Sequence, residues 1–165
     1  MENFLEKQQA FFFNFLTDSI DNFLLDHSDE TYYAFALVCN IHEEGEINVY
    51  LNTVELWQDT TDYYATKGYT DQQLQEMKYN AKDWDEDQQF ASLHLFDDWV
   101  EDPQAIEMVL EWISQQLILL VDSDTFERIP KAADFKVLVC DHDEEAADSQ
   151  ERFEKLTTSD YFQLN

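Results

Sequence analysis

The sequence predicts an α+β fold, a single-domain sandwich over residues 1–165 in which helices pack on an antiparallel or mixed sheet of about three to five strands. Three observations predict it. Long segments carry apolar residues at helical spacing, shorter segments are apolar runs rich in strand formers, and 13 Phe, 8 Tyr and 4 Trp supply core volume with only 2 Gly and 2 Pro. A chain of 165 residues buries roughly two-thirds of its unfolded surface, which suffices for a core without disulfides or metal.

The first predicted element is a long amphipathic helix from Glu2 to about Asp26, because most of its apolar residues are three, four or seven positions apart. Phe13 lies off this stripe, and Ser28 to Thr31 is expected to turn. The apolar stripe consists of Phe4, Leu5, Phe11, Phe12, Phe15, Leu16, Ile20, Phe23 and Leu24.

A β-hairpin is predicted next. Tyr32 to Cys39 is apolar almost throughout, which is typical of a central strand buried on both faces. Asn40 to Glu46 contains Gly45 and closes the hairpin, and Glu46 to Leu51 alternates as a half-buried strand does. The alternation places Ile47, Val49 and Leu51 on one face and Asn48 and Tyr50 on the other.

Two shorter helices are expected after the hairpin. Asn52 and Thr53 can cap the first, which runs through about Ala65 and ends at Gly68. Thr70, followed by Gln73, has the pattern of a capping box and opens a second helix. That helix carries Leu74, Met77 and Ala81.

The second half contributes one long helix and a last strand. Asp102 followed by Pro103 is a helix start, and the periodic stripe continues to about Val121. Pro130 interrupts the chain before the strand Phe135 to Cys140. Phe90 to Phe96 alternates weakly and is a short strand or an extended connector, whereas residues 141–151 form an acidic C-terminal segment.

The charge balance is the strongest functional signal. The chain has 37 Asp plus Glu against 9 Lys plus Arg, a formal net charge of −28. Nucleic acid and anionic membrane surfaces would repel such a surface, so the expected partner is a basic protein. Generic solubility or adaptation to high salt is the alternative explanation of the acidity.

The two cysteines indicate a reducing compartment. Cys39 and Cys140 each end an apolar run and form no CxxC pattern, so we expect buried, reduced thiols. No signal peptide is recognisable, and no uninterrupted apolar run approaches the length of a membrane span. We therefore expect a cytoplasmic protein.

No catalytic or metal-binding motif is complete. Asp83, Asp85 and Asp87 occupy the first three ligand positions of a calcium loop, but Gln88 replaces its turn glycine and His94 its last ligand. The sequence has neither a nucleophile elbow nor a glycine-rich phosphate loop. We expect no enzyme activity, no catalytic residues, no metal and no cofactor, although a hydrolase that uses carboxylates is an alternative.

The segment from Tyr79 to Asp102 is the predicted binding surface, because it interleaves carboxylates with tryptophan. Carboxylates accept bidentate hydrogen bonds from arginine, and tryptophan faces attract guanidinium groups. The alternative is that its two tryptophans are core anchors. The predicted partner-binding residues are Asp83, Trp84, Asp85, Glu86, Asp87, Asp97, Asp98, Trp99, Glu101 and Asp102.

Three short stretches carry a resemblance. They are YYAFALV at Tyr32–Val38, INVYLNT at Ile47–Thr53 and KYNAKDW at Lys78–Trp84. In this order they resemble a family of uncharacterised small bacterial proteins, a domain of unknown function with a YAFAL-like strand, an NT pair and an aromatic-x-x-x-Asp-Trp element. In that element Tyr79 stands where the family pattern favours tryptophan.

The resemblance implies a binding function and no catalytic residues. The family looks like those found beside polymorphic toxins, where small acidic proteins act as immunity factors. The first hypothesis is therefore an immunity-type inhibitor that neutralises a basic bacterial toxin such as a nuclease. The alternative binding function is a nucleic-acid mimic that occupies a DNA-binding protein.

Overall fold

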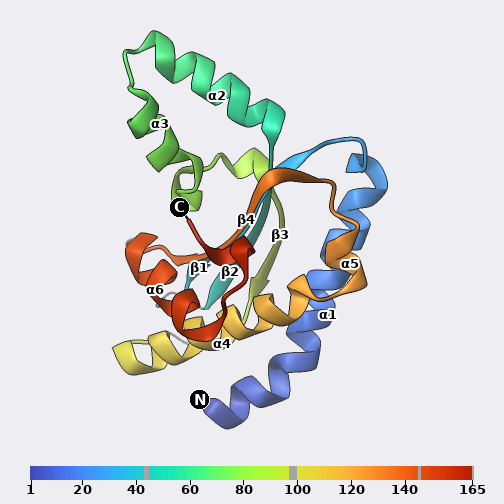
Figure 1. Ribbon diagram of the computed structural model, residues 1–165. Helices are drawn as coiled ribbons and strands as arrows, with labels where there is room; N and C mark the ends of the chain where they lie inside the picture. Colours follow the sequence, from blue (N-terminus) through green and yellow to red (C-terminus); the bar gives the residue numbers. More distant parts are fainter. Residues whose placement is uncertain (43–44, 97–99, 145, 165) are drawn as a thin grey trace.

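A four-stranded mixed sheet lies at the centre of the fold (Figure 1). This computed structural model describes residues 1–42, 45–96, 100–144 and 146–164. The helices and strands in chain order are α1 (Glu2–His27), β1 (Tyr32–Asn40), β2 (Glu46–Thr53), α2 (Val54–Thr66), α3 (Asp71–Lys78), the 3₁₀ turns η1 (Ala81–Asp83) and η2 (Glu86–Gln88), β3 (Gln89–His94), α4 (Pro103–Val121), α5 (Asp124–Glu127), β4 (Lys131–Asp141), α6 (Ala146–Leu156) and the 3₁₀ turn η3 (Asp160–Phe162).

The strands follow the order β3-β2-β1-β4. Strand β2 pairs antiparallel with both β1 and β3, whereas β1 and β4 are parallel. The predicted α+β class with a mixed sheet is thus confirmed, and β1 is an interior strand as expected. The weakly alternating segment near Phe90 is the edge strand β3.

The helix starts follow the capping residues that the sequence predicts. Thr53 Oγ1 accepts a hydrogen bond from the Leu56 amide at 3.1 Å, and Thr70 forms a capping box with Gln73. Asp102 caps α4 by accepting from the Gln104 amide at 3.0 Å. These side chains satisfy amides that the first helical turn leaves without an intrahelical partner. The α3 helix ends at Lys78, so Ala81 lies beyond it, buried in η1.

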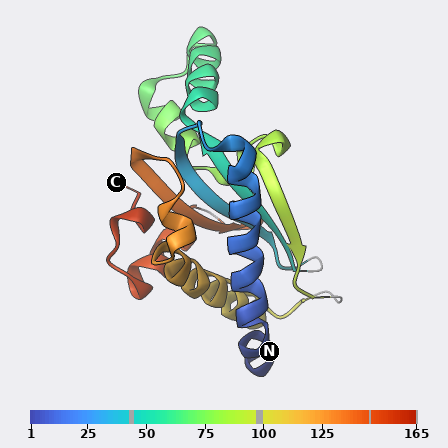
Figure 2. The same ribbon diagram turned by 90° about the vertical axis from the view of Figure 1, so that its right-hand side faces the viewer.

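One face of the sheet, the helix-covered face, packs under α1 and α4 (Figure 2). Its side chains from β1, β2 and β4 are apolar and share one cluster with the two helices. Phe12 of α1 is fully buried there, with its ring centroid 5.1 Å from that of Trp112 of α4. The predicted stripes of both helices therefore form the main core.

The predicted stripe of α1 needs one correction. Phe11 is 54% exposed, whereas Phe13 packs against the core from the position that the sequence placed off the stripe. The buried residues Leu5, Phe12, Leu16 and Ile20 define the centre of the apolar face. Three consecutive phenylalanines cannot all lie on one side of a helix, because successive residues are about 100° apart.

The opposite face, the loop-covered face, packs under residues 79–88 rather than under long helices. A β-bulge in β1 shifts the register between Tyr32 and Ala34 against both neighbouring strands. Tyr33 and Ala34 are consecutive, yet both belong to the loop-covered cluster. Bulges of this kind redirect a side chain and are frequent beside functional sites.

The acidic segment 141–151 is not a tail. Asp141 ends β4 and its carboxylate accepts from the Ile41 amide at 3.0 Å, and the segment then enters α6. Arg152 of α6 is 5% exposed and pairs with Glu107 of α4 at 3.2 Å and with Glu144. Helix α6 was not predicted, because it follows the acidic run 143–145 directly and few apolar residues mark its buried side.

Helix α4 qualifies the expectation that no apolar segment approaches the length of a membrane span. Over 18 residues its mean hydropathy is 1.2, so by length and composition it is the one helix in the described part of the chain that could span a membrane. Helix α4 contains no uninterrupted apolar run of that length, because polar residues such as Glu107 and Glu111 interrupt its apolar positions. Val109, Ile113 and Leu117 of this helix are buried against the sheet, as in the core helix of a globular domain.

Candidate functional site

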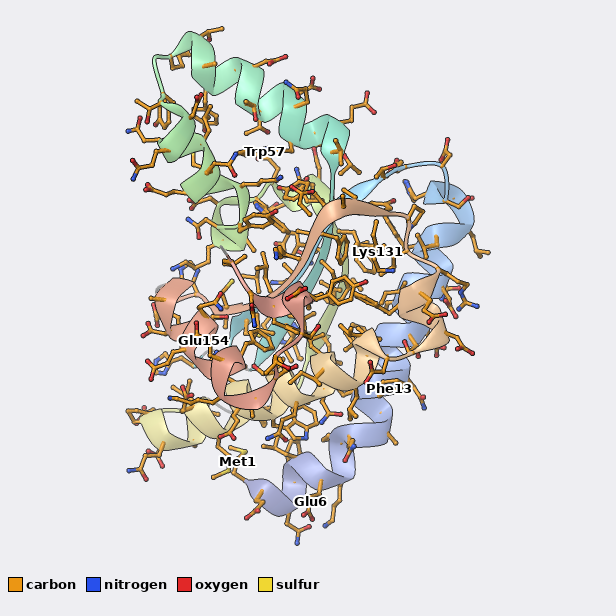
Figure 3. All side chains as sticks on the ribbon, viewed as in Figure 1. Met1, Glu6, Phe13, Trp57, Lys131 and Glu154 are labelled. Carbon is orange, nitrogen blue, oxygen red and sulfur yellow. The ribbon has the colours of Figure 1, made fainter. Side chains whose placement is uncertain are left out.

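A pocket of about 820 Å³ lies between α2, residues 83–88 and the loop-covered face of the sheet. We call it the aromatic pocket. Trp57 lies inside the angle that α2 and α3 make with the sheet (Figure 3). The volume of the aromatic pocket is in the range of sites that bind small molecules or large side chains.

Helices α2 and α3 form an arm that projects from the body of the molecule (Figures 1 and 2). None of the side chains of α2, all of which the structure describes, is buried. Leu56, Tyr63 and Tyr69 are between 42% and 57% exposed. These three side chains line the aromatic pocket, so the wall that the arm contributes is apolar and aromatic and stays partly accessible.

Three aromatic rings meet at the floor of the pocket. The Tyr33 ring centroid lies 6.0 Å from those of Trp57 and Trp84, and the Trp84 ring is nearly perpendicular to it. Trp84 contacts Tyr50 edge-on in the same way, at 6.2 Å. Offset and edge-to-face arrangements of this kind are the favourable ones and hold the rings in defined positions.

Buried polar atoms without a partner concentrate here. Four side-chain atoms that line the pocket are buried and have no hydrogen-bond partner among the described residues. They are the Tyr33 hydroxyl, Asn52 Oδ1, Trp84 Nε1 and Gln88 Oε1. An unsatisfied buried polar atom costs about 1–3 kcal/mol, so these four atoms make the pocket the part of the described structure where added hydrogen-bond partners would stabilise most.

Tyr33 and Asn52 are the most enclosed of the four, at 1% and 4% exposed. Burial raises the pKa of Tyr33 far above its ordinary value. Asn52 lies beside the hydroxyl and opposes this rise, but the two groups do not meet the geometry of a hydrogen bond. Tyr33 therefore stays a neutral hydroxyl that can donate or accept at any physiological pH.

The predicted binding residues divide into two groups. Asp83, Trp84 and Asp85 line the aromatic pocket, and Glu86 lines an adjoining hollow of about 420 Å³ that shares Trp84. Asp87 is exposed on η2, next to them. The structure thus brings the first half of the predicted surface together around one cavity.

The second half of the prediction is separated from this cavity. Asp97, Asp98 and Trp99 lie outside the described residues. Glu101 and Asp102 are exposed at the start of α4, beyond the far end of β3 from the pocket. Six strand residues span about 20 Å, so these two acids do not belong to the pocket.

Tyr79 supports the pocket from below rather than lining it. Its hydroxyl donates to the Asp134 carbonyl oxygen at 3.0 Å, and the neighbouring Lys78 ammonium pairs with the Asp134 carboxylate at 2.5 Å. Lys78 is 8% exposed and also lies 5.2 Å from the centre of the Tyr33 ring. These contacts fasten residues 78–84 to β4, so within the resembling KYNAKDW stretch Tyr79 is structural and Trp84 reaches the pocket.

Sequence reasoning missed Tyr33, Asn52 and Trp57. Tyr33 falls in the predicted buried strand, Asn52 is a predicted helix cap, and Trp57 falls within the helix predicted through about Ala65. The polar residues Asn48 and Asn52, which alternate with the aliphatic residues of β2, were the available signal, because a face that carries them is not an ordinary apolar core.

Within the described part of the chain, neither a metal centre nor the groove between α1 and α4 coincides with the predicted binding residues. Among the described residues, no group of three or more His, Cys, Asp or Glu side chains is placed to hold a metal ion, and Asp83 instead accepts from the Asn80 side chain at 2.6 Å. A groove of about 680 Å³ between α1 and α4, lined by residues such as Met108 and Leu119, is mainly apolar. None of the predicted binding residues lies in it.

Comparisons with known proteins identify a family but no individual similar protein or structure. No curated protein and no solved structure matches the chain. The sequence profile described as "Domain of unknown function (DUF4303)" matches residues 13–158, which include all four strands and the aromatic pocket. This match confirms the expected relationship to an uncharacterised domain family, and the chain belongs to the DUF4303 family.

Proposed function

We propose that this protein is an acidic binding protein that neutralises a basic bacterial protein, in the way that an immunity protein neutralises its toxin in the cytoplasm. The observation that carries the proposal is the aromatic pocket, where carboxylates surround tyrosine and tryptophan rings and buried polar atoms lack partners. Such a site suits a cationic protein surface better than an anionic or purely apolar one.

The net charge of −28 supports the same direction. Long-range attraction to a basic domain raises association rates by about 10- to 1,000-fold at low salt. Nucleases are basic because they bind phosphate backbones, so an inhibitor that blocks their substrate surface gains from acidity. A nuclease toxin is therefore the proposed class of target.

The projecting arm supports a protein rather than a small molecule as the partner. Leu56 and Tyr63 of α2 are 42% and 57% exposed, although the Lys67 ammonium lies over one face of the Tyr63 ring. Tyrosine and tryptophan at such positions are typical interface residues, because they bury much area with little loss of conformational freedom. A partner that rests on the arm would bury them.

The test begins with the neighbouring gene. A large secreted protein with a basic C-terminal domain is expected there, and this domain should stop growth when expressed alone but not together with the present chain. The two should form a stable complex whose association slows as salt increases. A neighbouring gene without such a domain, or a basic domain that neither binds nor is neutralised, would contradict the proposal.

A matched pair of charge reversals locates the surface. Asp85, Glu86 and Asp87, all exposed beside the pocket, are changed to Lys in one variant. The control changes Glu6, Asp18 and Asp26, three exposed acids of α1. The first variant should associate at least about tenfold more slowly and the control should change little. Equal losses would mean that residues 85–87 are not the binding surface and that only net charge matters.

A further inference from the structure

We propose that the aromatic pocket binds the side chain of one arginine residue of the partner and the backbone next to it. This inference rests on the proposed function, since it names the residue through which a basic partner would be anchored. The pocket combines three kinds of group that an arginine residue satisfies together: aromatic faces, carboxylates and unpartnered hydrogen-bonding atoms.

The aromatic rings already bind cations within the chain. Lys78 Nζ lies 5.2 Å from the centre of the Tyr33 ring, and Lys67 Nζ lies 5.2 Å from that of Tyr63. These distances are within the range of cation–π attraction. Trp57 and Trp84 line the same cavity, and tryptophan is the strongest of the aromatic partners for a cation.

The carboxylates exclude an anion and leave room for a positive charge. Asp59, Asp83 and Asp85 line the pocket, and in the described part of the chain no ion pair neutralises any of them. The nearby Lys78 is already paired with Asp134. A cation that enters the pocket therefore meets uncompensated negative charge.

The unpartnered atoms distinguish arginine from lysine. Asn52 Oδ1 and Gln88 Oε1 are acceptors, and a planar guanidinium offers five N–H donors in a fixed fork while it stacks on a ring. A lysine ammonium offers three donors from a single point and forfeits the stacking contact. The pocket thus matches the larger and flatter cation.

Trp84 Nε1 adds a requirement that a free cation does not meet. This indole N–H is a donor only, and it is buried without an acceptor among the described residues. The carbonyl oxygen of a peptide bond beside the arginine supplies that acceptor. The preferred ligand is accordingly an arginine within a polypeptide, which is the form that a basic protein presents.

The test uses the ¹⁵N-labelled protein and the blocked amino acid N-acetyl-arginine N-methylamide, followed through the indole N–H signals of tryptophan in NMR spectra. The Trp84 signal is identified by its disappearance in Trp84→Phe. It should shift in a saturable way at millimolar ligand. The lysine analogue should bind about tenfold more weakly, and the uncharged citrulline analogue should cause no saturable shift.

Free propylguanidine separates the two sources of the guanidinium group. It carries the same single positive charge without a peptide carbonyl, so it should bind more weakly than the blocked arginine and shift the Trp84 indole proton less. Equal binding of propylguanidine would mean that the site recognises a small cation. Equal binding of the citrulline analogue, or no saturable response to blocked arginine, would overturn the proposal.

Two asparagines of β2 provide a matched pair of variants. Asn52 and Asn48 both have an unpartnered, buried Oδ1 on the loop-covered face, but only Asn52 lines the aromatic pocket. Asn52→Leu should lose at least about tenfold in affinity for blocked arginine, and Asn48→Leu should stay within about twofold. Asn52→Leu should also melt at the same temperature or about 2–4 °C higher, because an unsatisfied amide is removed. Equal affinities of the two variants would refute the assignment of Asn52.

Failure of this inference is distinguishable from failure of the proposed function. If the basic neighbouring domain is neutralised and Asn52→Leu neutralises it equally well, the arginine site is wrong and the function stands. If blocked arginine binds at Trp84 but no basic domain is neutralised, the site stands and the function is wrong.

Discussion

The two faces of the sheet are built from the same strands, β1, β2 and β4, and differ in what covers them. Long helices cover one face, and the buried residues of its cluster are apolar throughout. A short loop segment covers the other, where Tyr33 and Asn52 leave polar atoms unsatisfied. Of the six unpartnered buried side-chain atoms among the described residues, all except Gln116 Oε1 belong to the loop-covered side. The molecule thus concentrates stability on one face and unsatisfied polar groups on the other.

The largest effect that this comparison predicts concerns the aromatic residues of the two faces. Phe12→Ala removes a fully buried ring from the helix-covered core and should lower the free energy of unfolding by about 3–5 kcal/mol. Trp57→Ala removes a larger but partly exposed ring and should cost only about 1–2 kcal/mol. Urea denaturation measures both. A costlier Trp57→Ala would mean that the loop-covered face is part of the stabilising core.

A smaller, pH-dependent effect is expected from the Lys78–Asp134 pair beneath the pocket. Partial burial raises the pKa of Asp134, but the hydrogen bond and charge of Lys78, together with hydrogen bonds from the backbone and Tyr79, lower it by more. A carboxyl group with a lowered pKa stabilises the fold above its unfolded pKa of about 3.9, and this stabilisation disappears as the pH falls through the folded value.

The measurement compares the wild type with Asp134→Asn, so that all other carboxyl groups cancel. The difference in melting temperature should be present at pH 7 and should shrink below about pH 4. A difference that is the same at both pH values would show that the ion pair does not stabilise the loop-covered face.

The smallest effect is kinetic and needs no substitution. Cys39 lies on the helix-covered face at 0% exposure and Cys140 on the loop-covered face at 9%. Burial raises the pKa of Cys39 well above its usual value and that of Cys140 to about 12, so both thiols react slowly in the native protein. A thiol reagent followed by mass spectrometry should modify Cys140 before Cys39. The reverse order would mean that the helical layer opens more readily than the loop.

Sequence periodicity predicts the helix-covered face well because repetition marks it. The stripes of α1 and α4 and the alternation of β2 each repeat over many residues, and the caps at Thr53, Thr70 and Asp102 set the helix starts. Apolar periodicity does not reveal helix α6, because Phe153 is almost the only apolar residue that marks its buried side.

The aromatic pocket was predictable only in part, because no repeat marks it. Residues 83–85 were recognised from local composition, in which acids alternate with tryptophan. Tyr33, Asn52 and Trp57 come from three different elements, and only folding brings them next to that segment. The bulge that turns Tyr33 towards the pocket depends on pairing with two other strands, which local sequence does not specify.

The parallel pairing of β1 with β4 has a consequence for synthesis on the ribosome. Strands β1 to β3 are complete once residue 94 has been made, but β1 lacks its second neighbour until residues 131–141 follow. At ordinary elongation rates this interval lasts about 2–10 s. Throughout it the apolar edge of β1 is open to another chain. Because incomplete chains already carry many more acids than bases, they repel one another, and the acidity thus also protects a slowly completed sheet from aggregation.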